Sequence, residues 1–202
     1  MKIIYLIRHG QTKSNFEKRF QGHTDIELNE LGLNQAKKLA LYSQNFKIDK
    51  IYSSDLLRAY NTANEIAKVK KIAIIKNKNL REGFFGAWEG KKVDDILSVE
   101  PKNYDAIFNN PENAIIKNGE SFPELQQRAW NEFQKIVAQE KDNSNIVIVS
   151  HGATIRTIIC SILGTRLNNM WKFIIDNTSI SCFYELDGEF YVKYLNDTSF
   201  LK

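Results

Sequence analysis

The segment IIYLIRHG (Ile3–Gly10) contains the pattern that decides the fold. Five apolar residues, three of them β-branched, stand in a row and are followed at once by Arg8 and His9. A short apolar run without alternation is typical of a parallel strand that is buried on both faces. The segment IVIVSHG (Ile146–Gly152) repeats the pattern of an apolar run, a histidine and a glycine. The sequence therefore predicts two interior strands that both end in His-Gly.

Strand and helix patterns alternate along the rest of the chain. Strands are predicted over residues 2–7, 49–53, 72–75 and 145–150, with a C-terminal hairpin of 179–186 and 189–195. Helices are predicted over 31–43, after the N-cap candidates Ser54 and Asp55, near 93–99 and 104–108, from Phe122 onward, and over 152–163. This alternation indicates an α/β fold with a mostly parallel sheet covered on both faces. Because no linker or repeat interrupts it, we expect a single domain over residues 1–202.

Charged and reactive side chains follow the predicted strands. In open parallel sheets, ligands bind beyond the carboxyl ends of the strands. His9 and His151 both lie there, Arg8 precedes His9, and Arg58 falls in the first turn of the helix after the second strand. Helix N-termini and arginines both favour anions. A single His-Gly segment after a strand is more often only a turn. Two such segments together with two arginines favour a phosphate-binding site in which a histidine can react.

Composition argues against several other classes of protein. The chain has 202 residues, 43% hydrophobic and 26% charged, as is typical of globular proteins. Its net charge of +4 comes from scattered lysine pairs, so we expect no nucleic-acid partner. The N-terminal apolar run is too short for a signal or a membrane span, and no membrane partner is expected. Cys160 and Cys182 lack CxxC spacing, which suits reduced thiols in the cytoplasm.

Three histidines without a metal-ligand motif argue against a metal site, and we expect no cofactor. A neutral histidine at this edge could instead attack phosphorus as a nucleophile and form a phosphohistidine. The leaving alkoxide then needs a proton from a carboxyl group or from His151. Glu82 follows the third predicted strand and is therefore a candidate for this proton donor. Glu89 is the nearest other carboxyl group that could take this role. The alternative for Glu82 is a loop salt bridge with Arg81.

These residues resemble the signature of the histidine phosphatase superfamily, also called the phosphoglycerate mutase-like family. The similarity runs in order along nearly the whole chain. Its blocks are LIRHGQT (6–12) with Asn15, QGHTD (21–25), LNELG (28–32), SSDLLRA (53–59) with Thr62 and Ala63, LRE (80–82), GAWEG (86–90), GES (119–121) and VSHG (149–152).

The resemblance implies a three-layer α/β/α sandwich with a mostly parallel central sheet and no metal requirement. It implies that His9 is the phosphorylated nucleophile, that Glu82 is the proton donor, and that Arg8, Arg58 and His151 hold the phosphate. The other residues that it assigns to phosphate or substrate binding are Gln11, Thr12, Asn15, Gln21, Gly22 and Gly152.

The resemblance covers both phosphatases and mutases. The chain is shorter than cofactor-dependent mutases, and its segment KKVDDIL (91–97) lacks their run rich in arginine and proline. We therefore predict a metal-independent phosphatase that hydrolyses the phosphomonoester of a small phosphorylated metabolite. The alternatives are a cofactor-dependent phosphoglycerate mutase and a non-catalytic phosphate-binding module. Residues 84–122 are expected to cap the pocket, and their aromatic side chains either wall the leaving group or pack beneath the cap: Phe84, Phe85, Trp88, Tyr104 and Phe108.

Overall fold

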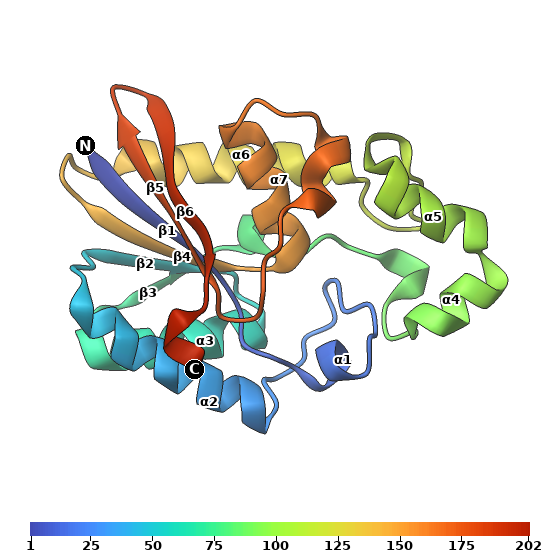
Figure 1. The fold of residues 1–202 in the computed structure, drawn as a ribbon, viewed down its shortest axis with the longest axis horizontal. Coiled ribbons are helices and arrows are strands. Elements are labelled where there is room, and N and C mark those ends of the chain that lie inside the picture. The colour runs from blue at the N-terminus through green and yellow to red at the C-terminus, as the bar shows by residue number, and fades with distance from the viewer.

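A central sheet with helices on both faces forms the body of the molecule (Figure 1). The computed structural model describes residues 1–202. The strands lie in the order β3-β2-β4-β1-β5-β6, in which the first four are parallel and β5 and β6 are each antiparallel to the preceding neighbour. The predicted three-layer sandwich with a mostly parallel sheet is thus confirmed. The strands are β1 (Lys2–Arg8), β2 (Lys50–Ser53), β3 (Ile74–Lys76), β4 (Asn145–Ser150), β5 (Ile180–Leu186) and β6 (Glu189–Asp197).

Two pairs of long helices cover the sheet, with α2 and α3 on one face and α6 and α7 on the other (Figure 1). None of the helices is both long and apolar enough to cross a membrane. The α-helices are α1 (Lys13–Phe16), α2 (Glu30–Tyr42), α3 (Leu57–Lys70), α4 (Val93–Val99), α5 (Pro101–Asn109), α6 (Phe122–Gln139) and α7 (Gly152–Ile162).

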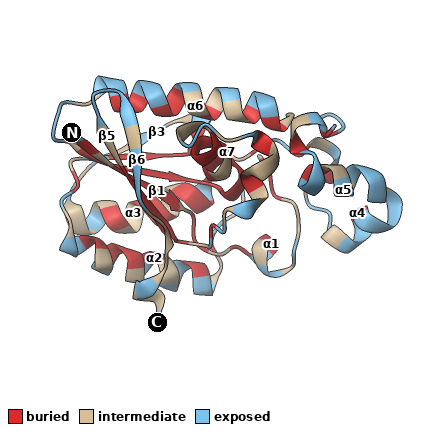
Figure 2. Cartoon of the chain, turned by 45° about the horizontal axis from the view of Figure 1, so that its top comes forward, coloured by how far each residue is buried: buried red, intermediate tan, exposed pale blue.

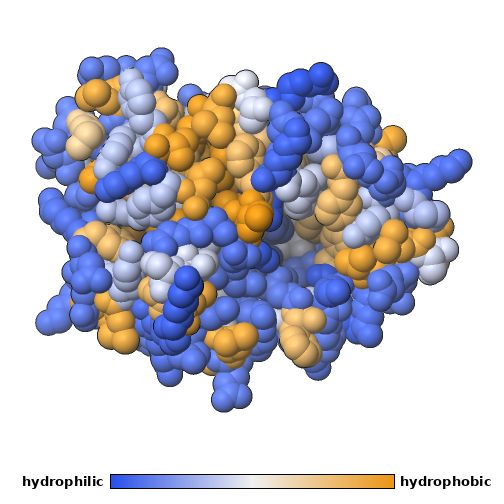
Figure 3. All heavy atoms as spheres, in the orientation of Figure 1, coloured by the Kyte–Doolittle hydropathy of each residue, from blue (hydrophilic) through white to orange (hydrophobic).

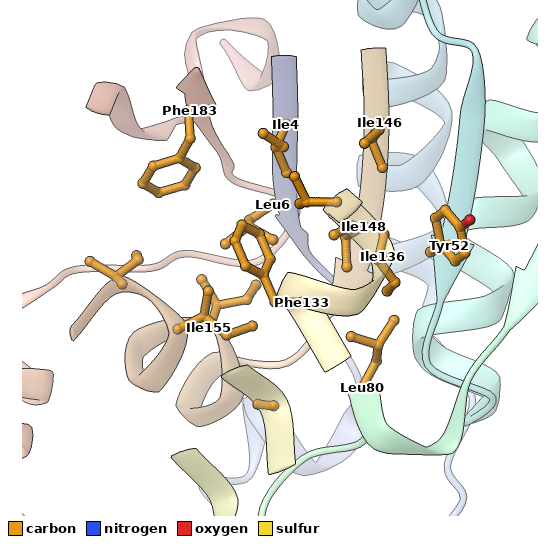
Figure 4. Close-up of a cluster of buried hydrophobic side chains, with 14 of the residues drawn as sticks. Ile4, Leu6, Tyr52, Leu80, Phe133, Ile136, Ile146, Ile148, Ile155 and Phe183 are labelled. Carbon is orange, nitrogen blue, oxygen red and sulfur yellow. The ribbon is translucent and has the colours of Figure 1, made fainter. Parts of the chain in front are cut away.

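The apolar run of β1 divides its side chains between the two faces of the sheet. Ile4 and Leu6 pack with Phe133 of α6 in one cluster (Figure 4), whereas Tyr5 packs with Leu39 of α2 in another. Successive side chains of a strand point to opposite faces, so a strand between two helical layers needs an apolar residue at every position. The continuous run in the sequence is therefore a consequence of the central place of β1.

The register of β1 and β4 brings their ends together. Arg8 pairs with Ser150 as the last residue pair of the two parallel strands. The chain then leaves the sheet at His9 and His151 on the same edge, and the His9 amide donates to the Ser150 carbonyl at 3.0 Å. The two His-Gly segments therefore meet in space, although they are far apart in the sequence.

A third apolar cluster lies under α4 and α5, whose outer surfaces are largely exposed (Figure 2). The Phe20 ring makes edge contacts with Phe85 and Trp88, at centroid distances of 4.9 and 5.3 Å. Trp88 is 1% exposed, whereas Phe84 and Phe108 remain 39% and 36% exposed. Packing beneath the helices describes Trp88 and Phe85, of which Phe85 also lines the cavity described below, but Phe84 lies outside this cluster and outside the cavity lining.

The predicted start of α3 is wrong. The helix begins at Leu57, and its N-cap position is held by Leu56, which offers no side-chain acceptor. The free Leu57 amide instead donates to Oδ1 of Asp25 at 2.7 Å. Ser54 and Asp55 have other partners, because both lie at the edge of the sheet where the charged residues gather.

Candidate active site

Arg8, His9, Arg58 and Glu82 line one cavity of about 210 Å³, whereas His151 is fully buried beside it and does not line it. The cavity opens beside α4 and α5, where Figure 3 shows a hollow in the surface. No group of three or more potential metal ligands occurs in the structure. The predicted site residues that line the cavity are Arg8, His9, Asn15, Gln21, Gly22, Arg58 and Glu82.

His9 is held in one tautomer with one nitrogen free. Its Nδ1 lies 2.7 Å from the Gly10 carbonyl oxygen. Because a carbonyl can only accept, Nδ1 carries the proton and Nε2 keeps its lone pair. Burial, together with Arg58 and Arg8, holds the pKa of His9 well below its usual range. His9 is therefore a neutral ring with a free nucleophilic nitrogen.

Arg58 is fully buried and binds three protein groups. Its two terminal nitrogens donate to the carbonyls of Gly22 and Thr24, at 2.7 and 2.9 Å. Its Nε donates to Nδ1 of His151 at 3.2 Å, so the His151 proton lies on Nε2, which donates to Ser54 Oγ at 2.8 Å. Burial lowers the pKa of Arg58 to about 10. Two N–H bonds of the guanidinium remain for a ligand.

His151 has the same charge state as His9. Burial, followed by the fields of Arg58 and His9, holds the pKa of His151 well below its usual range. The two rings lie with their centroids 5.1 Å apart. The site thus combines two neutral imidazoles with two guanidinium cations, an arrangement that favours an anion of more than one charge.

Arg8 has a buried donor without a partner. One terminal nitrogen donates to the Ile175 carbonyl at 2.7 Å, but Nε is buried and makes no hydrogen bond. Burial also lowers the pKa of Arg8. A buried donor without a protein acceptor is rare in proteins. Gly152 lies against this guanidinium, since a Cβ there would come within 3.4 Å of Arg8 Nε.

Glu82 accepts hydrogen bonds from the first turn of α7. Its carboxylate accepts the backbone amides of Gly83, Ala153 and Thr154, at 3.1, 3.2 and 3.1 Å, and the Thr154 hydroxyl at 3.1 Å. The alternative that Glu82 forms a salt bridge with Arg81 is wrong.

Arg81 and Glu89 are both occupied elsewhere. Arg81 binds both carboxylate oxygens of Asp55, at 2.7 and 2.6 Å. Glu89 accepts the backbone amides of His23 and Thr24, at 2.7 and 2.9 Å, and the Thr24 hydroxyl at 2.6 Å. Glu89 therefore shapes the neighbouring loop, which leaves Glu82 as the carboxyl group of the cavity.

Gln11 and Thr12 lie behind the cavity wall. Thr12 caps α1, and its hydroxyl donates to Oε1 of Gln21 at 2.9 Å. The side-chain oxygen of Gln11 accepts from the Asn29 side chain, and the backbone amide of Gln11 donates to the Gln35 side chain. Both residues fix the path of the loop that carries Gln21 into the cavity.

Other residues of the site were not predicted. Ser54 was predicted as a helix cap and lies in the block SSDLLRA (53–59), but it was given no role in the site, and nothing in the sequence signals its bond to His151. Asn177 donates to the His9 carbonyl at 2.9 Å from an irregular segment without a recognisable pattern. Arg156 donates to the Phe173 and Gly152 carbonyls near Arg8, and burial lowers its pKa to about 10. Arg156 had a usable signal, because it is the only charged residue in the apolar stretch of α7.

The chain matches the family model described as histidine phosphatase superfamily (branch 1) over residues 4–198. The chain belongs to this superfamily. It is 33% identical to "Phosphoserine phosphatase 1" of Hydrogenobacter thermophilus, over 100% of the chain and 95% of that protein. The histidine phosphatase fold is shared with Bacillus stearothermophilus YhfR, which is 32% identical with a TM-score of 0.95 and full coverage of both chains.

A second solved structure in the superfamily is phosphoserine phosphatase from Entamoeba histolytica in complex with 3-phosphoglyceric acid. It is 32% identical, with a TM-score of 0.90 and full coverage of both chains. The histidine phosphatase superfamily that the sequence motifs indicate is therefore confirmed over almost the whole length of the chain.

Proposed function

We propose that this protein hydrolyses phosphomonoesters through a phosphohistidine on Nε2 of His9. The observation that carries the proposal is the free Nε2 of a neutral, buried His9 in a cavity that Arg8 and Arg58 also line. The guanidinium groups would bind the phosphoryl oxygens of a substrate. The two arginines then stabilise the charge that develops on phosphorus, so the reaction needs no metal ion.

In the first step the Nε2 lone pair of His9 attacks phosphorus and the bond to the ester oxygen breaks. Glu82 gives its proton to the departing alkoxide. The Nδ1–H bond to the Gly10 carbonyl persists and stabilises the positive charge of the phosphorylated ring.

In the second step the Glu82 carboxylate takes a proton from water, and the oxygen of that water attacks phosphorus. The phosphorus–nitrogen bond breaks, its electron pair returns to Nε2, and inorganic phosphate leaves. The phosphatase names of the relatives support hydrolysis rather than transfer to a second hydroxyl group. The same names favour a phosphatase over a mutase, and the intact His9 and Glu82 disfavour a non-catalytic binding module.

The outer part of the cavity indicates the class of substrate. Its volume of about 210 Å³ is below that of sites for drug-sized ligands, which favours a small metabolite. Phe20, Phe85 and Val93 form an apolar wall, whereas Lys18 supplies a positive charge. The neighbouring Glu17 pairs with Lys13 and Arg19, so Lys18 is left without an acidic partner. We propose a substrate that carries a second negative charge beside its phosphate.

We also propose that the chain is a single domain in which residues 84–122 form an insert over the cavity. The apolar cluster beneath α4 and α5 supports this, because it is separate from the two clusters that cover the sheet. A cytoplasmic location is supported by the free thiols of Cys160 and Cys182, since a reducing compartment preserves unpaired thiols.

The test is hydrolysis of p-nitrophenyl phosphate in EDTA by the wild type and by His9→Ala. We expect turnover by the wild type, near-background rates for the variant, and an acid-labile phosphoprotein in the quenched wild type only. Full activity of a folded His9→Ala variant would refute the proposal. With 3-phosphoglycerate and a bisphosphate primer, free phosphate should be the main product, and accumulation of 2-phosphoglycerate would instead indicate a mutase.

A further inference from the structure

Arg128 of α6 binds the backbone on both sides of the Glu82 side chain without touching the cavity. One terminal nitrogen donates to the carbonyls of Asn79 and Arg81, at 2.8 and 3.3 Å, and the other donates to the carbonyl of Glu82 at 3.3 Å. The Glu82 carbonyl also accepts from Nε2 of His23 at 2.9 Å. The main chain that carries the acid is thus held from two directions.

Glu120 fixes the guanidinium in this position. Its two carboxylate oxygens accept from Nε and a terminal nitrogen of Arg128, at 2.8 and 2.7 Å. The side chains of Arg128 and Glu120 are 21% and 17% exposed, so solvent weakens this bidentate pair less than a surface pair. Arg128 therefore has a fixed orientation, as a group that positions a backbone must have.

The same pair reaches the stem of residues 84–122. The Glu120 amide donates to the Phe84 carbonyl at 2.7 Å, and the Phe84 amide donates to the Glu120 carboxylate at 3.4 Å. A Cβ on Gly119 would lie 2.5 Å from the Phe84 carbonyl oxygen, so the two ends of the insert approach too closely for any side chain there. Arg128 and Glu120 therefore join the insert and the Glu82 loop into one unit.

We propose that Arg128, oriented by Glu120, is a positioning residue for the proton donor Glu82. This inference rests on the proposed function, because it assumes the acid role of Glu82. Without Arg128, three carbonyls lose their charged donor, and the Glu82 carbonyl keeps only His23, whereas the Arg81 carbonyl keeps the Thr154 hydroxyl at 2.8 Å. The carboxyl group would then lose its alignment with the leaving oxygen, while Arg8, His9 and the phosphate pocket stay intact.

The experiment compares Arg128→Met with the wild type on two substrates that differ in leaving group. One is O-phosphoserine or 3-phosphoglycerate, whichever the wild type hydrolyses faster, and the other is p-nitrophenyl phosphate. The alkoxide needs a proton and the nitrophenolate does not. We expect kcat/KM to fall roughly tenfold or more for the alkyl ester, with a much smaller change for the aryl ester. Arg128→Lys, which keeps the charge and one donor, should recover part of the loss.

Arg166→Met is the matched control, because it removes an arginine–glutamate pair with Glu112 that does not contact the Glu82 loop. It should leave the ratio of the two substrates unchanged. Partial unfolding of Arg128→Met would lower the activity on both substrates equally. The ratio of kcat/KM for the alkyl ester to that for the aryl ester therefore reports positioning alone. Equal losses on both substrates, or no loss, would overturn the inference.

Glu82→Gln, measured on the same two substrates, distinguishes the acid role of Glu82 from the positioning role of Arg128. If it shows the leaving-group dependence and Arg128→Met does not, the acid role stands and the positioning role is refuted. If Glu82→Gln itself shows no such dependence, the acid role fails and the positioning role fails with it. Hydrolysis through His9 would still be tested separately by the phosphoprotein.

Discussion

Acidification should unfold this protein through its two buried histidines. His9 and His151 are neutral in the folded chain, because burial and the neighbouring arginines hold both pKa values well below their usual range. In the unfolded chain each ring takes up a proton near pH 6.5. The unfolded state therefore binds more protons below that pH, and stability falls as the pH is lowered.

The size of the effect follows from proton linkage. Each histidine that is charged only in the unfolded state costs about 1.4 kcal/mol per pH unit. Two such residues give about 2.7 kcal/mol per pH unit below pH 6.5, until the pH reaches their lowered pKa values. A protein of ordinary stability, about 5–15 kcal/mol, would lose between roughly a fifth and a half of it between pH 6 and pH 5. The stability that the two neutral histidines contribute is fully present above about pH 6.5.

The assay is urea unfolding at pH 7.5, 6.0 and 5.0 in buffers without phosphate, followed by circular dichroism. Phosphate is excluded because an anion between Arg8 and Arg58 would favour protonated histidines. His9→Gln should reduce the slope to that of about one proton, and the double variant with His151→Gln should flatten it further. A free energy of unfolding that stays constant from pH 7.5 to pH 5 would refute the claim that both rings are held neutral.

Three further changes test other parts of the structure. Phe133→Ala empties the centre of the cluster between the sheet and α6, and thermal unfolding should show a loss of about 3–5 kcal/mol. Arg58→Lys keeps the charge but loses the donors to Gly22, Thr24 and His151, so kcat/KM should fall at least roughly 100-fold in steady-state assays while the fold persists in circular dichroism. Lys18→Met should lower kcat/KM for phosphoserine about fivefold or more relative to the uncharged-tail ester glycerol 3-phosphate, and an unchanged ratio would contradict the second-anion proposal.

The sequence by itself determined the layers and the edge at which the chemistry lies. A run such as Ile3–Ile7 is typical of a strand buried on both faces, and the parallel arrangement brings the ends of β1 and β4 to one edge. His9 and His151 could therefore be placed together without the structure. The predicted bounds of β4 agree with the observed Asn145–Ser150, because an uninterrupted apolar run depends little on its surroundings.

Only the tertiary structure decided which partner each polar side chain takes. Ser54 and Asp55 are equally good caps by local rules, yet Ser54 accepts from His151 and Asp55 binds Arg81, while a distant aspartate, Asp25, accepts from the first turn of α3. Arg128 likewise looks like any charged residue of an amphipathic helix until α6 packs beside the Glu82 loop. Apolar periodicity is a local property of the chain, but a hydrogen bond needs two groups within about 3 Å, and for these residues only the folded chain brings the two groups together.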